Sequence, residues 1–240
     1  MSKGIMIIGT DTDVGKTVVA GGLMHLLLKK GCQAAYFKPV ASGDVTVAGV
    51  SVPADPAFVE AVSGFHEARR LVTPCFYADS LAPHLAARLA GRPVDPAVIL
   101  KSLDDLKKRY EVIVAEAAGG LMVPLNDEGF LQCDLIRALG FPCLLVARAG
   151  LGTINHTLLT LRAARDRGLN VRGIVINNAG DSLIETDNIA MIRKLAGVDG
   201  VFVLPRIDDM EPDRLRPGKI RDVFERAIEI SGIVAMMEDI

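Results

Sequence analysis

Six short runs of apolar residues recur along the chain, and longer segments with helical periodicity separate them. The runs are rich in Val and Ile and contain few polar positions, as in strands that are buried on both faces of a parallel sheet. They cover Ile5–Ile8, Ala34–Phe37, Val112–Ala115, Cys143–Ala147, Gly173–Ile176 and Val201–Leu204. Since parallel neighbours need crossover connections, helices must cover both faces of the sheet. The pattern predicts a three-layer α/β fold with a central, mainly parallel sheet.

The segments between these runs predict the helices, and several begin near a proline or end at a glycine. They comprise Val14–Lys30, Asp55–Ser63, Pro83–Ala90, Pro96–Tyr110, Gly152–Arg167, Ile184–Leu195 and Lys219–Met237. The least regular stretches are Ala41–Pro53 and Arg206–Gly218, which we interpret as loops. Because no repeat or low-complexity linker divides the chain, we expect residues 1–240 to form a single domain.

Composition narrows the class of function. Lys plus Arg number 27 and Asp plus Glu number 29, so the formal net charge is −2. This balance gives no electrostatic case for binding nucleic acid or an anionic membrane surface. The four cysteines form no Cys-x-x-Cys pair, and no apolar stretch has the length of a signal peptide core or a transmembrane helix. We therefore expect a cytoplasmic protein that acts on small molecules.

A candidate phosphate-binding loop, GTDTDVGKT, occupies Gly9–Thr17 between the first predicted strand and the first predicted helix. In such loops backbone amides and the positive end of the helix dipole hold phosphate oxygens. Lys16 would reach the terminal phosphates, and the Thr17 hydroxyl would coordinate Mg²⁺. Thr10 stands where the usual pattern has glycine, and Gly15 alone could also begin an ordinary helix. The preceding strand favours the phosphate loop.

Two charged residues follow predicted strands at the edge where open α/β sheets bind ligands. Lys38 comes directly after Ala34–Phe37, where a second cation near Lys16 would stabilise charge on a transferring phosphoryl group. A solvated lysine after a strand is the alternative. Glu116 ends the third predicted strand, where its carboxylate can ligate Mg²⁺ from the side opposite Thr17.

Six separated segments, in this order, resemble motifs of the dethiobiotin synthetase family. They are GTDTDVGKT (9–17), FKPVASG (37–43), APHLAA (82–87), EAAGGLMVPL (116–125), GLGTINHTLLT (150–160) and GIVINN (173–178). The resemblance covers residues 5 to about 205. It implies a P-loop NTPase fold and an enzyme that uses Mg²⁺ and takes ATP as co-substrate. It also implies closure of the ureido ring of dethiobiotin from 7,8-diaminopelargonate and CO₂ or bicarbonate, through a carbamate and a carbamic-phosphoric anhydride.

The resemblance assigns the catalytic and metal-binding roles. Lys38 is expected to hold the carbamate, and Ser42 to hydrogen-bond the substrate. Asp55 is expected to be a third metal ligand beside Thr17 and Glu116, although an Asp at a helix start is also a common first-turn residue. Thr12 is expected to donate to the γ-phosphate or the carbamate. The predicted catalytic residues are Lys38, Lys16 and Thr12.

The remaining assignments concern the nucleotide and the tail of the substrate. The family has a helix start that holds the substrate carboxylate across the interface of a homodimer. The residues of this chain that match it are Gly152, Thr153, Ile154 and Asn155. Thr153 capping its own helix is the alternative. Asn177 matches an amide that reads adenine, and Pro205 a backbone contact to the base. The predicted nucleotide contacts are Asp13, Val14, Gly15, Lys16, Thr17, Val18, Glu116, Asn177 and Pro205.

Two other functions compete with the ligase. A MinD-like regulatory switch ATPase would carry a second, signature lysine near the start of the phosphate loop, where this chain has Thr10, Asp11 and Thr12. It would also hydrolyse ATP without a need for Lys38 or Ser42. A glutamine-dependent amidoligase would carry a further domain with a nucleophilic Cys and a His, and we expect none in these 240 residues.

Overall fold

A seven-stranded sheet forms the centre of the computed structural model, which describes residues 2–240. The strands are β1 (Lys3–Gly9), β2 (Ala34–Phe37), β7 (Val112–Glu116), β8 (Cys143–Arg148), β9 (Val171–Ala179), β10 (Gly200–Pro205) and β11 (Glu238–Asp239). Their order is β10-β9-β8-β1-β7-β2, and every pair in that series is parallel. All six predicted strands are present, and the predicted α/β class is confirmed.

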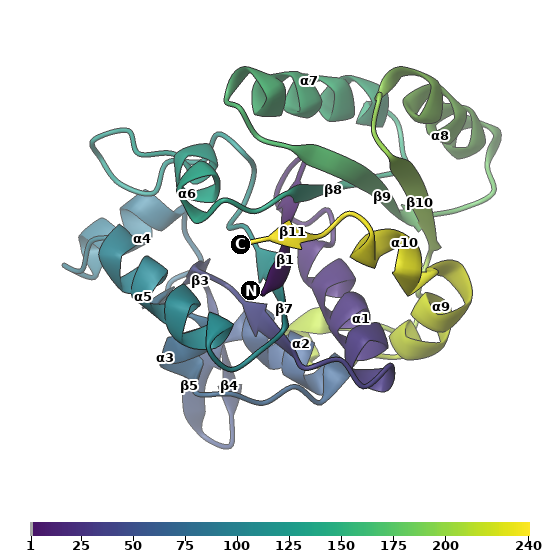
Figure 1. The fold of residues 1–240 in the computed structure, drawn as a ribbon. Coiled ribbons are helices and arrows are strands. Elements are labelled where there is room, and N and C mark those ends of the chain that lie inside the picture. Colours follow the sequence, from purple (N-terminus) through teal and green to yellow (C-terminus); the bar gives the residue numbers. More distant parts are fainter. Residues whose placement is uncertain (1) are drawn as a thin grey trace.

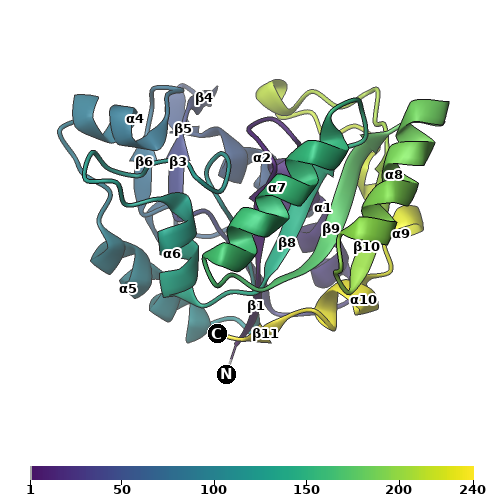
Figure 2. The same ribbon diagram turned by 90° about the horizontal axis from the view of Figure 1, so that it is seen from above.

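Helices cover both faces of this sheet (Figures 1 and 2). On one face α7 (Thr153–Asp166) and α8 (Leu183–Leu195) lie over β8, β9 and β10. On the other face α1 (Lys16–Lys29) packs against β1, β2 and β7, while α9 (Ile220–Ala227) packs against β10. Residues Ile5–Ile8 are fully buried between the layers. A strand enclosed in this way needs apolar side chains on both faces, which explains its unbroken apolar sequence.

A second group of elements lies beyond the β2 edge of the sheet. It contains β3 (Val40–Ser42), β6 (Cys75–Tyr77), α2 (Ala54–Ser63), α3 (Arg69–Val72) and α4 (Pro83–Leu89). Strands β3 and β6 form a parallel pair of their own, and α2 packs along α1. The helices α5 (Pro96–Lys107) and α6 (Gln132–Leu139) precede β7 and β8. The sequence did not predict β3, α3, β6, α6 or β11.

The interpretation of Ala41–Pro53 as a loop was wrong. Strands β4 (Asp44–Val47) and β5 (Val50–Pro53) form an antiparallel hairpin, with Val47 paired to Val50. Both residues of the turn between them, Ala48 and Gly49, have positive φ, as a two-residue type I′ turn requires. Alanine rarely adopts that conformation, so the turn carries no familiar sequence signal.

The prediction of one closing helix over Lys219–Met237 was also wrong. The segment forms α9 and then α10 (Ile230–Val234), because Ile228 between them is extended (φ −116°, ψ 115°). The Ile228 side chain is 5% exposed, so its burial in the core accompanies the break in the helix. The predicted loop Arg206–Gly218 contains only a short 3₁₀ turn at Pro212–Arg214.

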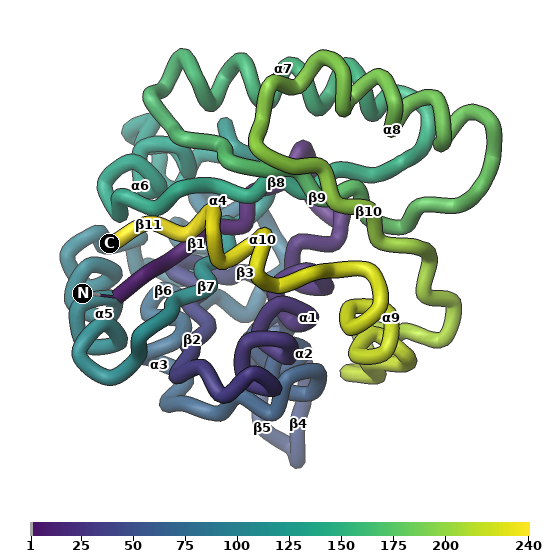
Figure 3. The backbone as a smooth tube through the Cα atoms, turned by 45° about the vertical axis from the view of Figure 1, so that its right-hand side comes forward, coloured from purple at the N-terminus to yellow at the C-terminus, as the bar shows by residue number. Residues whose placement is uncertain are grey.

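The sheet order places a topological switch at β1. The connection through α1 leads toward β2, whereas β8 lies on the opposite side of β1. Ligands in open α/β sheets bind beyond the carboxyl ends of the strands at such a point. At the amino ends of the strands, away from this point, the C-terminal strand β11 pairs antiparallel with Lys3 and Gly4 of β1 (Figure 3). Within residues 2–240, no helix has the length and apolar character that a membrane crossing requires.

Candidate nucleotide and metal site

The phosphate loop connects β1 to α1 and has an unusual backbone. Asp13 and Gly15 both have positive φ (55° and 95°), which turns the chain sharply before α1 begins. The Lys16 side chain folds back over the loop, and its Nζ donates to the carbonyl oxygen of Asp11 at 2.8 Å. Lys16 is 7% exposed. Its ammonium group is therefore held at the loop, where bound phosphates would lie.

Four side chains from separate elements converge beside this loop. The Thr17 hydroxyl, in the first turn of α1, lies 2.9 Å from Oδ1 of Asp55 and 2.9 Å from Oε1 of Glu116. Lys38, just after β2, places its Nζ 2.7 Å from Oδ2 of Asp55 and 2.6 Å from Oε1 of Glu116. The sequence predicted every member of this group, including Asp55, whose position depended on the family resemblance.

Burial makes the charges of this group strongly interdependent. The side chains of Lys38 and Glu116 are 3% and 1% exposed, whereas Asp55 is 36% exposed. Burial lowers the pKa of Lys38, but the charges of Asp55 and Glu116 outweigh it and raise that pKa well above its ordinary value. Burial raises the pKa of Asp55, and the Lys38 charge reverses this, so the net pKa is lowered. Both groups are therefore ionised at neutral pH.

Lys16 shows the opposite balance. Burial, followed by repulsion from Lys38, lowers the pKa of Lys16 to about 8. The carboxylates of Glu116 and Asp55 act against that shift without overcoming it. An anionic ligand would restore the ordinary preference of Lys16 for the charged form.

The donor set fits a magnesium ion. Thr17, Asp55 and Glu116 offer oxygen atoms from three elements, and Mg²⁺ prefers oxygen ligands. Within residues 2–240 no group of three or more His, Cys, Asp and Glu side chains could form a complete metal cage. Two carboxylates suit Mg²⁺ bound to a nucleotide, because this ion commonly completes its octahedron with water and substrate phosphates.

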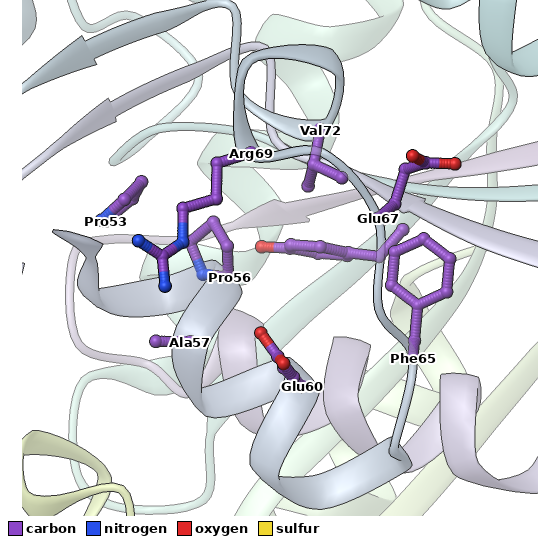
Figure 4. A pocket seen from close by; sticks show the side chains of 9 residues that line it. Pro53, Pro56, Ala57, Glu60, Phe65, Glu67, Arg69 and Val72 are labelled. Atoms are coloured by element: carbon purple, nitrogen blue, oxygen red, sulfur yellow. The ribbon is translucent and has the colours of Figure 1, made fainter. Parts of the chain in front are cut away.

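These groups line one end of a cleft of about 830 Å³. The predicted site residues among its lining are Thr12, Asp13, Val14, Gly15, Lys16, Thr17, Val18, Lys38, Ser42, Asp55, Glu116, Asn177 and Pro205. A second hollow, between α2 and α3, measures only about 20 Å³ and is lined by Pro56, Phe65 and Arg69 among others (Figure 4). That volume holds about one water molecule. The cleft, by contrast, has the volume of a small-molecule binding site.

Asn177 and Pro205 lie at the cleft wall formed by β9 and β10. The side-chain Nδ2 of Asn177 donates to the carbonyl oxygen of Val14 at 3.0 Å. The amide crosses Gly15 so closely that a Cβ on Gly15 would lie 1.9 Å from Nδ2. Asn177 therefore ties β9 to the phosphate loop, and glycine at position 15 is required by both φ and space.

The predicted carboxylate-binding segment lies apart from this cleft. Gly152, Thr153, Ile154 and Asn155 begin α7, and none of them lines the cleft. The Thr153 hydroxyl donates to the carbonyl oxygen of Arg148 at 2.5 Å, so it holds the turn before α7. Asn188 of α8 donates to the carbonyl oxygen of Ala149 at 2.9 Å and fixes the same turn. Within one chain, the structure does not bring this segment to the phosphate loop.

Two residues at the site were missed by the sequence analysis. The Tyr36 hydroxyl donates to Oε2 of Glu116 at 2.7 Å. Arg148, at the end of β8, lines the cleft and donates to the carbonyl oxygen of Thr12 at 3.1 Å. Both signals were present in the sequence: Tyr36 is two residues before Lys38 and so shares its strand face, and Arg148 is a charge at the carboxyl end of an apolar strand.

Comparison with known proteins relates this site to a family. A family model described as an AAA domain matches residues 3–214. The ATP-dependent dethiobiotin synthetase of Clostridium kluyveri is 40% identical, and the alignment covers 100% of both chains. That of Clostridium novyi is 42% identical over 94% of each chain. That of Bacillus licheniformis is 37% identical over 98% of this chain and 97% of its own.

Solved structures with a similar fold are more distant in sequence. The septum site-determining protein MinD of Pyrococcus horikoshii, complexed with Mg-ADP, has a TM-score of 0.63 and 14% identity, covering 98% of this chain and 94% of its own. The signal recognition particle receptor FtsY of Elizabethkingia anophelis has a TM-score of 0.55 and 15% identity, covering 98% and 65%. These likenesses show the P-loop fold alone and do not favour a switch ATPase. With relatives of 37–42% identity over nearly its whole length, the chain belongs to the family of ATP-dependent dethiobiotin synthetases.

Proposed function

We propose that this protein is an ATP- and Mg²⁺-dependent ligase of biotin biosynthesis that closes the ureido ring of dethiobiotin. Its substrates would be 7,8-diaminopelargonate, CO₂ and ATP. One observation carries the proposal beyond the relatives' names: Lys16, Lys38 and the oxygens of Thr17, Asp55 and Glu116 converge at one end of a cleft of about 830 Å³. Two cations and a metal-binding carboxylate pair are what phosphoryl transfer to an anionic acceptor needs.

The reaction has three bond-forming steps. An amine of the substrate attacks CO₂ and loses a proton, which gives a carbamate. A carbamate oxygen attacks the γ-phosphorus of ATP, and ADP leaves with the bridging oxygen. The second amine attacks the carbonyl carbon of this mixed anhydride and loses a proton to solvent, the bond from carbon to the phosphate oxygen breaks, and phosphate leaves as the ring closes.

The lysines supply the electrostatic part of this chemistry. Lys16 and the loop amides from Asp13 to Val18 would hold the terminal phosphates. Lys38, whose pKa is raised by the charges of Asp55 and Glu116 against the effect of burial, is charged at neutral pH and would hold the carbamate and stabilise the transferring phosphoryl group. Removing one such preorganised charge donor costs about 10²–10³-fold in kcat in other enzymes. Thr12 would donate to the γ-phosphate or the carbamate, and Ser42 would hydrogen-bond the substrate from the same cleft.

Thr17, Asp55 and Glu116 would hold Mg²⁺. The ion, when bound, would neutralise charge on the β- and γ-phosphate oxygens. The carboxylates are suited to this role because they converge beside Thr17, with Asp55 2.7 Å and Glu116 2.6 Å from Nζ of Lys38. At the cleft wall formed by β9 and β10, Asn177 and the backbone at Pro205 would contact the base of the nucleotide.

The tail of the substrate would be held by a second copy of the chain. At the start of α7 the amide of Thr153 donates to the carbonyl oxygen of Gly150 at 3.2 Å, which leaves the amides of Ile154 and Asn155 for a carboxylate. Large apolar side chains surround α7 and α8 at the surface: Leu151, Leu159, Leu183 and Ile184 are 92%, 60%, 86% and 56% exposed. A homodimer that covers these residues would place the segment against the partner's cleft. We place this dimer in the cytoplasm, since the four cysteines are free thiols.

Phosphate release tests the proposal. The protein is incubated with ATP, Mg²⁺ and bicarbonate, with and without 7,8-diaminopelargonate. We expect release only with the diamine, near loss in Lys16→Ala and Lys38→Ala, and normal release in the matched control Lys108→Ala. Lys108 is an exposed lysine whose partner is Asp105 on the surface. Equal hydrolysis without the diamine would instead support a regulatory switch ATPase.

The interface has its own test. Leu151→Glu places a charge on a side chain that is 92% exposed, so it should fold normally as a monomer. Sedimentation should show loss of the dimer together with a raised KM for the diamine. A variant that stays dimeric with an unchanged KM would place the substrate tail elsewhere.

A further inference from the structure

Tyr36 is a buried polar residue to which the proposed reaction gives no role. It lies on β2, is 1% exposed, and donates its hydroxyl proton to Oε2 of Glu116 at 2.7 Å. The other carboxylate oxygen, Oε1, lies 2.6 Å from Nζ of Lys38 and 2.9 Å from the Thr17 hydroxyl. The two oxygens of Glu116 therefore have separate partners: one faces the cleft, and the other faces the phenol.

The sheet fixes this arrangement. Tyr36 is paired with Val114 in the register of β2 and β7, and Glu116 is two residues further along β7. Side chains two residues apart on a strand share a face, so Tyr36 and Lys38 approach the same carboxylate from one strand. Residues 34–37 of β2 and 113–116 of β7 are buried, so the phenol–carboxylate contact lies inside the sheet layer.

The bond controls the rotation of the carboxylate. The terminal torsion of a glutamate is broad, so an unheld carboxylate samples many orientations. Partners behind a metal ligand usually fix its orientation, and their loss typically costs 10–100-fold in metal affinity or activity.

We propose that Tyr36 is a positioning residue for the metal ligand Glu116: its hydroxyl holds Oε2 so that Oε1 faces Thr17 and the bound Mg²⁺. This inference rests on the magnesium site of the proposed function. It assigns the Mg²⁺ affinity of the nucleotide complex partly to a residue that contacts neither the metal nor the nucleotide.

Calorimetry of ADP binding tests the assignment without the reaction. In wild type, ADP affinity is measured in EDTA and over a series of Mg²⁺ concentrations. In Tyr36→Phe we expect unchanged ADP affinity in EDTA. The Mg²⁺ concentration that gives half of the full increase in ADP affinity should be about 10–100-fold higher than in wild type. Tyr110→Phe is the matched control: its hydroxyl donates to Oε2 of Glu67 at 2.9 Å, away from the cleft, and its removal should leave both quantities unchanged.

A double-mutant cycle separates positioning from a general structural role. Glu116→Ala alone should weaken the Mg²⁺ effect, and adding Tyr36→Phe should weaken it by less than twofold more, because Tyr36 acts through that carboxylate. Additive losses would overturn the proposal, as would a Mg²⁺ profile in Tyr36→Phe within twofold of wild type. If Tyr36→Phe yields no folded protein, Tyr36→Leu and the cycle on that background decide the question in the same way.

The outcomes are distinct from failure of the ligase reaction. The calorimetric measurements contain no diamine and no bicarbonate, so hydrolysis independent of the diamine would leave the Tyr36 result intact. Conversely, the ADP affinity of the wild-type protein could prove independent of the Mg²⁺ concentration. That result would overturn the metal site and this inference together, even if phosphate release depended on the diamine.

Discussion

Replacing Lys38 with methionine removes the cation between the carboxylates of Asp55 and Glu116 while keeping most of the side-chain volume. Lys38 and Glu116 are 3% and 1% exposed, so Glu116 is left as a buried charge without this partner. Breaking a buried pair by removing one member costs about 3–5 kcal/mol. In a chain of this length about 1 kcal/mol lowers Tm by roughly 2–4 °C. We therefore expect Lys38→Met in EDTA to unfold roughly 6–20 °C below wild type.

The pH dependence of this loss follows from the pKa of Asp55. That pKa is lowered in the folded protein, so the stabilisation from Lys38 is present above the ordinary pKa of an aspartate, about 4. It is lost as pH falls further and Asp55 takes up a proton. The Tm difference between Lys38→Met and wild type should therefore stay constant from pH 7 to about pH 4 and shrink as pH falls further. Mg²⁺ added with ADP should also reduce the difference, because the metal ion brings positive charge to the same carboxylates.

Thermal unfolding in EDTA at several pH values is the assay, and Lys29→Met is the control. Lys29 contacts Glu225 at 2.6 Å, but their side chains are 56% and 33% exposed. Such surface pairs contribute about 0–1 kcal/mol. A Tm of Lys38→Met within 2 °C of wild type at pH 7, or a difference that grows as pH falls, would refute the argument.

Three further predictions concern the loop and the thiols. Gly15→Ala should abolish ADP binding, since its Cβ would lie 1.9 Å from Asn177, whereas Gly31→Ala, with no neighbour within 4 Å, should bind ADP normally in calorimetry and lose only stability. The pKa of Lys16 is lowered to about 8, so in EDTA the affinity for ADP should fall from pH 7 to pH 9. Binding of ADP at pH 8 should also take up protons, which calorimetry in two buffers measures. Burial raises the pKa of Cys143 to about 12, so iodoacetamide at pH 8 should leave it unmodified by mass spectrometry while it alkylates half-buried Cys32.

The sequence predicted those parts of the fold that depend on burial. The strand β1 is enclosed on both faces, and this forces an apolar run that any reading of hydrophobicity detects. The hairpin of β4 and β5 is different: it lies at the surface, and its turn uses Ala48 in a left-handed conformation. The helix breaks at Ile228, whose side chain is buried in the core. The spacing of apolar residues along the chain does not predict that break.

The candidate site divides in a similar way. Lys16, Lys38, Thr17 and Glu116 lie at strand ends or a helix start, so parallel topology alone brings them to one edge. Asp55 came from the family resemblance. The contact between Tyr36 and Glu116 depends on the register of β2 against β7, and one sequence does not contain that register.

Isotope labelling of the product tests the central claim most directly. The protein is incubated with ATP, Mg²⁺, 7,8-diaminopelargonate and ¹³C-bicarbonate, and phosphate and the organic product are measured in the same sample. The mechanism predicts one dethiobiotin for each phosphate released, with the label in the ureido carbonyl carbon. Phosphate formed without a labelled cyclic product would contradict the assignment of this cleft to ring closure.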